Sequence, residues 1–347
     1  MLRRLNPIGP DLGVDFGSSR LRVFAPGKGI IVDVANTVVV DTRHERVVAY
    51  GDAALGMHGR TPPGVVTVEP VRAGEVADFD TARWLLARVL RESGAAGRLA
   101  RPRIAVCIPQ EATDVTRRAL AETCWQSGAR DVRYVDAAWA ASVGTGLPAS
   151  EPRGSMVADI GVDSTRTAVL VLGEIVTAEL VRSGGSAFEL ALVEYLRHGR
   201  ELQLSRAAAE LLKMRVGVAP TPDARVQEEV LVAGRGMRNG LPESQRVPIA
   251  ELHAAMEKPL RGVVDAMAHA VASSPPELCE DLRDRGIVLT GRGAQLSGLV
   301  GRASQALGLP VHLSDDPGSA AAEGAARLAR APRPAIHRPV PQTRVPA

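Results

Sequence analysis

The sequence predicts an α/β protein made of two related lobes with a cleft between them, and two observations support this prediction. A strand–turn–strand phrase occurs twice, as GVDFGSSRLRVF at 13–24 and as VADIGVDSTRTAVLVL at 157–172. After each phrase, strand-like apolar runs alternate with amphipathic helical runs, an order typical of parallel strand pairs covered by helices. The 347 residues, 45% of them hydrophobic, are enough for two domains of ordinary size.

In the first half of the chain, short apolar runs predict strands at 12–16, 20–25, 30–32, 37–41, 104–109 and 132–135. Apolar residues at helical spacing predict helices at 81–93, 114–128 and 137–146. Asp114 lies in the first turn of the second helix, and Gly128 ends it. Residues 46–80 are rich in Gly, Pro and Val, so we expect loops with short strands there.

In the second half, a hairpin over 168–180 should turn at Gly173 and Glu174. The same patterns predict further strands at about 225–233, 286–291 and 310–314. They predict helices at 186–199, 205–215, 250–272, 294–308 and 319–329. Pro259 should kink the third of these helices.

The predicted organisation has a connecting segment, PASEPRG at 148–154, between the two lobes. The parts are an arm at 1–10, a first lobe at 11–147 with a subdomain at about 30–80, a second lobe at 148–313 with a subdomain at about 184–250, a closing helix at 314–329 that returns to the first lobe, and a tail at 330–347. The tail is rich in proline and has no acidic residue, so it should stay disordered.

Composition excludes several classes of protein. Three cysteines lie far apart without a C-x-x-C pair, which fits a reducing cytosol and argues against a disulfide framework. The seven histidines form no pair spaced for zinc. A net charge of +3 and only 3% aromatic residues give no support for a nucleic-acid partner. The chain has no run of 18 apolar residues, so no membrane span is predicted.

The repeated phrase predicts a phosphate site. A tight turn between two strands points backbone N–H groups at one spot, and such a concavity attracts anions. Glycine allows close approach of the backbone, and hydroxyl side chains add donors. An aspartate at the end of the entering strand can hold Mg²⁺, usually through water. Two such turns, one in each lobe, would grip one triphosphate. A third turn, at Gly291 and Gly293, could accept a flat base against backbone.

Longer stretches make the chain similar to a known family over about residues 11–329. It resembles the actin-like ATPases, and specifically the bacterial MreB/Mbl rod-shape proteins. The stretches that carry the resemblance are GVDFGSS, GDAALGMHGRTP, VEPVRAGEVADFD, RPRIAVCIPQEATDVTRRAL, GARDVRYVDAAWAASVGTGLP, GSMVADIG, RSGGSAFELALVEYLR, AAELLKMRVG, VLTGRGAQLSGL and LSDDPGSAAAEGAA.

The resemblance implies an actin-like ATPase fold whose two lobes surround a nucleotide cleft that binds ATP and Mg²⁺. The residues that match the family's nucleotide contacts are Asp15, Gly17, Ser18 and Ser19 on a first phosphate loop, Asp159, Gly161, Ser164 and Thr165 on a second, Gly184 and Gly185 near phosphate and ribose, Glu210 and Lys213 beside the adenosine, and Gly291 and Gly293 beside the adenine. Asp15 and Asp159 would hold Mg²⁺ through water. Taken alone, Glu210 and Lys213 also fit a surface ion pair.

The chain departs from the family at the sites of chemistry. The second loop reads Gly161-Val162-Asp163 where the family has three glycines, so Asp163 places a negative charge beside the phosphates unless a metal or Arg166 offsets it. Ser186 replaces an aspartate after the paired glycines. Ala137 replaces the glutamate that orients the attacking water, and its neighbour Asp136 is the candidate substitute. Loss of such a group typically removes about 10²–10⁴ of rate, so we expect at most a slow ATPase.

By resemblance, the chain should be cytoplasmic, should assemble into filaments with itself, and should take part in cell-shape and cell-wall morphogenesis at the inner face of the membrane with cell-shape membrane proteins as partners. The loop at 94–100 offers only Leu99 between Arg98 and Arg101 for membrane contact, and a solvated loop fits equally. Two alternatives stay open: a small-molecule kinase of the same fold, and a degenerate paralogue that regulates or scaffolds other filaments without forming them.

Overall fold

A computed structural model describes residues 8–97, 101–218 and 228–329. The chain divides into two compact units, 1–147 with 319–347 and 148–318. The predicted arm extends too far, because Ile8–Pro10 already belong to the first strand. The predicted second lobe ends too early, because 314–318 also belong to the second unit. The predicted disordered tail lies outside the described residues.

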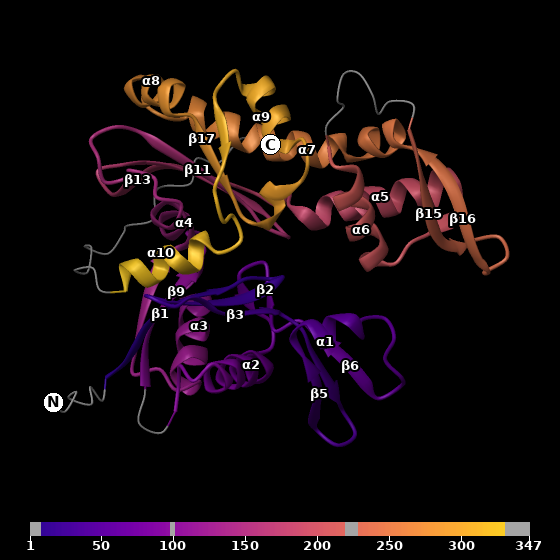
Figure 1. Cartoon of the computed structure of the whole chain (residues 1–347), viewed down its shortest axis with the longest axis horizontal. Coiled ribbons are helices and arrows are strands. Elements are labelled where there is room, and N and C mark those ends of the chain that lie inside the picture. Colours follow the sequence, from indigo (N-terminus) through magenta and orange to yellow (C-terminus); the bar gives the residue numbers. More distant parts are fainter. Residues whose placement is uncertain (1–7, 98–100, 219–227, 330–347) are drawn as a thin grey trace. The chain divides into compact units, whose positions relative to one another are not determined.

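The first unit is built on a five-stranded sheet in the order β10-β9-β1-β2-β3 (Figure 1). The strands are β1 (Ile8–Phe16), β2 (Arg20–Ala25), β3 (Gly29–Ala35), β9 (Arg101–Ile108) and β10 (Asp131–Asp136). β1 runs parallel to β9 and antiparallel to β2. Alternation along β1 sends Leu12 and Val14 into the main core of this unit, where both are fully buried.

Helices cover both faces of this sheet. α2 (Phe79–Glu92) and α3 (Asp114–Gln126) pack on the face that holds the main core, while α4 (Ala137–Gly144) and α10 (Ala320–Leu328) pack on the other (Figure 1). α4 and α10 approach unusually closely at Gly144 and Gly324. A Cβ added at Gly144 would lie 1.8 Å from the carbonyl oxygen of Ala320, so only glycine fits there.

A small sheet with the order β5-β4-β6 projects from the first unit. It consists of β4 (Val38–Asp41), β5 (Arg46–Tyr50) and β6 (Val65–Val68), with a short helix α1 (Gly51–Gly56) that the sequence patterns did not predict. A two-stranded ribbon of β7 (Val71–Arg72) and β8 (Glu75–Val76) follows.

The second unit repeats the topology of the first sheet. Its order is β13-β12-β11-β17-β18, with β11 (Ser155–Ile160) antiparallel to β12 (Thr165–Val171) and parallel to β17 (Ile287–Thr290). β13 (Glu174–Val181) and β18 (Val311–Leu313) form the two edges. Each sheet therefore has three antiparallel strands followed by two parallel strands, which confirms the prediction of two related lobes.

The helices of the second unit are α5 (Gly185–Arg200), α6 (Arg206–Val216), α7 (Ile249–Ala272), α8 (Pro276–Arg285) and α9 (Leu299–Leu307), with a 3₁₀ turn η1 (Arg292–Gln295). A further small sheet joins β14 (Leu202–Gln203), β15 (Glu229–Gly236) and β16 (Pro242–Pro248). α7 continues as one helix across Pro259. α8, β14 and β16 were not predicted. The predicted helix 294–308 starts only at Leu299, because Gly298 adopts a φ of 85°.

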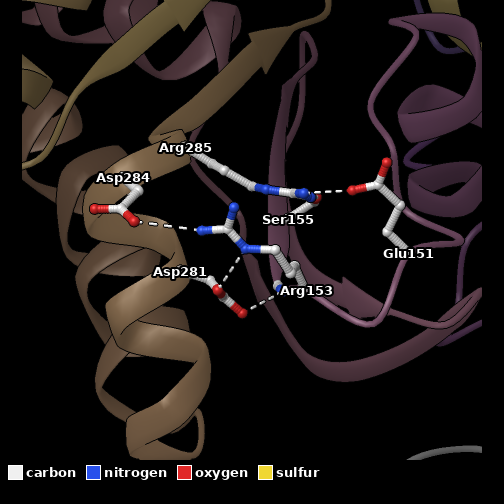
Figure 2. A network of polar contacts seen from close by, with 7 residues as sticks. Glu151, Arg153, Ser155, Asp281, Asp284 and Arg285 are labelled. Carbon is white, nitrogen blue, oxygen red and sulfur yellow. Dashed lines mark hydrogen bonds and ion pairs between the residues drawn. The ribbon is translucent and has the colours of Figure 1, made fainter.

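The connecting segment is fastened to the second unit by a polar network on α8 (Figure 2). The guanidinium of Arg153 donates to Asp281 at 3.0 Å and contacts Asp284 at 3.3 Å. The N–H of Gly154 donates to the other oxygen of Asp281 at 2.7 Å. On the opposite side of the segment, Arg285 pairs with Glu151 and donates to the hydroxyl of Ser155. The chain is thus held against α8 before β11 begins.

Candidate functional site

The hairpin turn of the first unit lies between β1 and β2. The N–H of Gly17 donates to the carbonyl oxygen of Arg20 at 3.0 Å, which leaves Ser18 and Ser19 at the tip. Among the residues that the structure describes, the N–H groups of Ser18 and Ser19 have no hydrogen-bond acceptor. The tip therefore combines two hydroxyl groups with two backbone donors, the composition of an anion-binding turn.

Asn36, which the sequence patterns did not single out, braces this turn. Its side chain is almost fully buried, and its amide donates to the carbonyl oxygens of Ser18 at 2.9 Å and Val71 at 2.6 Å. Its own N–H donates to the carbonyl oxygen of Ser19 at 2.8 Å. Because the N–H of a trans peptide points opposite to the carbonyl of the preceding residue, the contact of Asn36 with the carbonyl of Ser18 directs the N–H of Ser19 away from Asn36.

Arg20 follows the tip, but its guanidinium pairs with two carboxylates outside the turn. It pairs with Asp33 and, at 2.7 Å, with Asp52. Burial opposes ionisation of Asp33, but its hydrogen bond from Arg20 and the nearby charge of Arg22 outweigh burial and hold the pKa of this carboxyl below its ordinary value. These contacts anchor the second strand of the hairpin. In the register of the two strands, Asp15 on β1 lies directly opposite Arg22 on β2.

The second hairpin matches the first residue by residue. Gly161 donates to the carbonyl oxygen of Ser164 at 2.9 Å, as Gly17 does to Arg20. Asp159 stands opposite Arg166, as Asp15 stands opposite Arg22. In this register Val162 and Asp163 occupy the places of Ser18 and Ser19.

The hydroxyl groups predicted for the second loop lie behind its tip. Ser164 and Thr165 are both buried, and the hydroxyl of Thr165 donates to the carbonyl oxygen of Ser183 at 2.7 Å. The hydroxyl proton of Thr165 is therefore used in a hydrogen bond that joins the start of β12 to the segment before α5. The tip itself carries an apolar side chain and a carboxylate, so the two turns have the same backbone but different chemistry.

Gly184 and Gly185 bring the start of α5 against this second turn. The N–H groups of Gly185 and Ser186 donate to the carbonyl oxygens of Gly161 at 3.0 Å and Val162 at 2.9 Å. A Cβ at Gly184 would lie 2.6 Å from both of these oxygens. The glycine pair thus makes close approach to the turn feasible, and the first N–H groups of α5 already have acceptors within the protein.

Gly291 and Gly293 enclose the same strand end from the other side. Gly291 has a φ of 80°, and a Cβ there would lie 2.4 Å from a carboxylate oxygen of Asp159 and from the carbonyl oxygen of Ile160. A Cβ at Gly293 would lie 2.8 Å from the carbonyl oxygen of Ile160. The end of β11 is therefore packed between two glycine turns.

Glu210 and Lys213 do not share one environment. Glu210 is exposed on α6, whereas Lys213 is buried. The ammonium of Lys213 pairs with Glu189 of α5 at 2.5 Å. Glu189 was not predicted, although it lies four residues after Gly185 and so one helical turn from the glycine pair.

Asp136, the candidate substitute for the missing base, caps α4. One carboxylate oxygen accepts from the N–H groups of Ala138 at 2.9 Å and Trp139 at 3.0 Å. Ala137 is the first residue of the helix. Capping is a complete structural reason for an aspartate at this position.

The structure thus gathers most predicted residues of the second unit around the end of β11. Those residues are Asp159, Gly161, Ser164, Thr165, Gly184, Gly185, Lys213, Gly291 and Gly293. Asp15, Gly17, Ser18 and Ser19 lie together in the first unit. Asn36 and Glu189 are the residues that sequence reasoning missed, because a brace is defined only by which distant segments it joins.

The repeated sheet topology and two comparisons with solved structures show an actin-like α/β fold. MreB 5 of Spiroplasma citri bound to AMPPNP superposes with a TM-score of 0.86 at 22% identity, over 92% of this chain and 96% of that one. The MamK double helical filament superposes with a TM-score of 0.76 at 20% identity, over 92% and 98%. The predicted actin-like α/β fold is confirmed.

Sequence relatives identify the family. A family model described as MreB/Mbl protein matches residues 9–335. The cell shape-determining protein MreB of Escherichia coli (strain K12) is 35% identical over 322 residues, 90% of this chain and 91% of that protein. The cell shape-determining protein Mbl of Bacillus subtilis (strain 168) is 32% identical over 307 residues, 88% and 92% respectively. The chain belongs to the MreB/Mbl family, which confirms the resemblance stated above.

Proposed function

We propose that this chain is a nucleotide-binding cytoskeletal protein that assembles into filaments and takes part in determining cell shape. The observation that carries the proposal is the pair of register-matched hairpin turns, each preceded by an aspartate opposite an arginine. Relatives named for cell-shape determination and a structural neighbour bound to AMPPNP support it.

The residues of the first turn fit a phosphate group. Ser18 and Ser19 offer N–H and hydroxyl donors, and glycine at 17 keeps side chains away from the approach. Asp15 and Asp159 each place one carboxylate beside a turn, which suits Mg²⁺ because that ion is usually held by one or two carboxylates together with phosphates and water. Mg²⁺ would offset the negative charge of the phosphates when the nucleotide is bound.

The second turn fits the nucleotide less well. Val162 contributes only its N–H, and Asp163 adds negative charge at the tip. Gly184, Gly185, Gly291 and Gly293 act by packing the backbone around this turn, so that it keeps the same shape as the first. We therefore propose a weaker hold on the phosphates here than in the first unit.

Hydrolysis should be slow. Ala137 cannot orient water, and Asp136 is engaged as the cap of α4. The chain would then function chiefly through nucleotide binding, since a ligand shifts a conformational equilibrium whenever it binds one state more tightly.

Filaments at the inner face of the cell membrane are the proposed site of action. Cell-shape membrane proteins are the proposed partners. The structure contains no helix, within its described ranges, that is both long and apolar enough to cross a bilayer.

High-speed sedimentation tests the proposal. The purified chain with Mg²⁺ and ATP should pellet above a critical concentration, and the fraction pelleted should fall when nucleotide is omitted. Asp15→Asn should reduce pelleting by weakening Mg²⁺–nucleotide binding, whereas Asp80→Asn, an exposed residue in the first turn of α2, should not. A chain that stays in the supernatant under all conditions would overturn the assignment to filaments.

A further inference from the structure

A buried ion pair lies directly behind the start of α5. Glu189 on α5 and Lys213 on α6 are joined at 2.5 Å, and each side chain is only 9% exposed. Taking two charges out of water is costly, and the pair is tolerated only if further polar contacts satisfy it. The second carboxylate oxygen of Glu189 lies 3.8 Å from Arg206, and Lys213 makes a second contact to the backbone.

That second contact connects the pair to the turn. The ammonium of Lys213 donates to the carbonyl oxygen of Gly185 at 3.4 Å. The N–H of Gly185 in turn donates to the carbonyl oxygen of Gly161 at 3.0 Å. One peptide unit beyond, Ser186 donates to Val162. A continuous series of polar contacts thus runs from Glu189 through Lys213 and Gly185 to the tip of the second hairpin.

We infer that Glu189 is a positioning residue for the nucleotide, acting through Lys213 to fix the start of α5 against the Gly161–Ser164 turn. The inference rests on the proposed nucleotide-binding function. It also assigns Lys213 a supporting role. Its ammonium is buried and uses two of its three N–H donors on Glu189 and Gly185.

The competing interpretation is that Lys213 touches the nucleotide and Glu189 merely neutralises it. The two interpretations predict opposite effects of Glu189→Gln. If Lys213 binds phosphate or ribose directly, releasing it from Glu189 should leave affinity unchanged or raise it. If the pair positions the turn, the uncompensated Lys213 should lose its fixed place and affinity should fall.

A double-mutant cycle with two readouts distinguishes them. Glu189→Gln, Lys213→Met and the double variant are compared with wild type by calorimetric titration of Mg²⁺–ATP and by amide hydrogen exchange without nucleotide. We expect each single variant to weaken Mg²⁺–ATP binding about tenfold, and the double variant to be no weaker than the worse single one. Amides of Gly185 and Ser186 should exchange about tenfold faster in all three.

Glu194→Gln is the matched control, because Glu194 is an exposed carboxylate on the same helix. It should change neither affinity nor exchange. If Glu189→Gln does not fold, Glu189→Asp keeps the charge but shortens the reach, and it should show the same direction of change in both readouts.

The inference is overturned if Glu189→Gln leaves the exchange of Gly185 and Ser186 unchanged, or if it tightens Mg²⁺–ATP binding. Additive losses in the double variant would also overturn it, since independent contacts add. Failure of the proposed function looks different. In that case wild type binds no nucleotide, while hydrogen exchange still shows whether Glu189 holds the turn.

Discussion

At the level of single residues, the glycines of the second unit serve packing before they serve any ligand. Added Cβ atoms at Gly184, Gly291 and Gly293 would all meet carbonyl oxygens of the Ile160–Val162 segment at 2.4–2.8 Å. Backbone atoms cannot yield as flexible side chains do. These glycines therefore determine the shape of the turn, and substitution should disturb folding and binding together.

Gly184→Ala should destabilise the chain by about 1–3 kcal/mol, because the new methyl group would force α5 away from the turn. Chemical denaturation measures the change. Gly301→Ala is the control: Gly301 is exposed within α9, and a Cβ there meets no atom within 4 Å. This second change should stabilise by about 0.5–1 kcal/mol through helix propensity. Equal effects of the two substitutions would refute the packing explanation.

Asn36→Ala should cost about 1–3 kcal/mol, because it removes the donor to the part-buried carbonyl group of Ser18 and to the buried carbonyl group of Val71. It should also weaken Mg²⁺–nucleotide binding by releasing the tip of the first turn. Denaturation and titration on the same preparation test both effects. Unchanged stability would show that the brace is unimportant.

The two matched turns were predictable from the sequence, but the side chains that brace them were not. Asp15, Gly17 and their counterparts Asp159 and Gly161 follow from a local phrase whose geometry is fixed within a few residues. The hydroxyl of Thr165 is different, because its partner Ser183 lies in another part of the fold. Side chains that join distant segments depend on tertiary contacts, which a single sequence does not specify.

At the level of elements, strands and helices with clear apolar periodicity were predicted well. β2 was predicted with its observed bounds, and α7 within one residue at its start. The errors fall where periodicity is weak. α8 buries only Leu282 among its ten residues, and β16 is a largely exposed edge strand, so neither carries a strong apolar pattern.

The network on α8 makes a prediction about pH. The N–H of Gly154, followed by the guanidinium of Arg153, stabilises the ionised carboxylate of Asp281 and lowers its pKa below the ordinary value. A lowered pKa contributes stability above about pH 4 that is lost as the pH falls through the folded-state value. Asp281→Asn should therefore be less stable than wild type at pH 7, and the difference should shrink toward pH 3.

Denaturation curves for both proteins at several pH values would check this. Asp265→Asn, on the preceding helix α7, is a suitable control because Asp265 is exposed and forms no ion pair with the residues that the structure describes. A difference between wild type and Asp281→Asn that does not change between pH 7 and pH 3 would contradict the assignment of the stabilisation to the charged carboxylate.

For the molecule as a whole, family membership favours ATP binding and hydrolysis, whereas two residues of the predicted site disfavour hydrolysis and tight phosphate binding. The chain belongs to the MreB/Mbl family, yet we propose that Ala137 slows hydrolysis and that Asp163 weakens phosphate binding. We interpret this combination as retained binding with reduced turnover. The position of Ala137 at the start of α4 allows a direct test, because acidic residues suit the first turn of a helix.

Ala137→Glu should raise ATP turnover by about 10²-fold if the chain lacks only the group that orients water. Single-turnover assays measure the rate, and Ala137→Met supplies a control of similar size without a carboxylate. Turnover in wild type that already equals the glutamate variant would show that another residue performs this role.

Calorimetric titration of the purified chain with ATP in the presence of Mg²⁺ tests most directly whether the two matched turns hold a nucleotide. We predict saturable binding of one nucleotide per chain, weakened by either Asp15→Asn or Asp159→Asn. Absence of binding at millimolar ATP, or binding that neither substitution affects, would contradict the proposal that these turns form the nucleotide site.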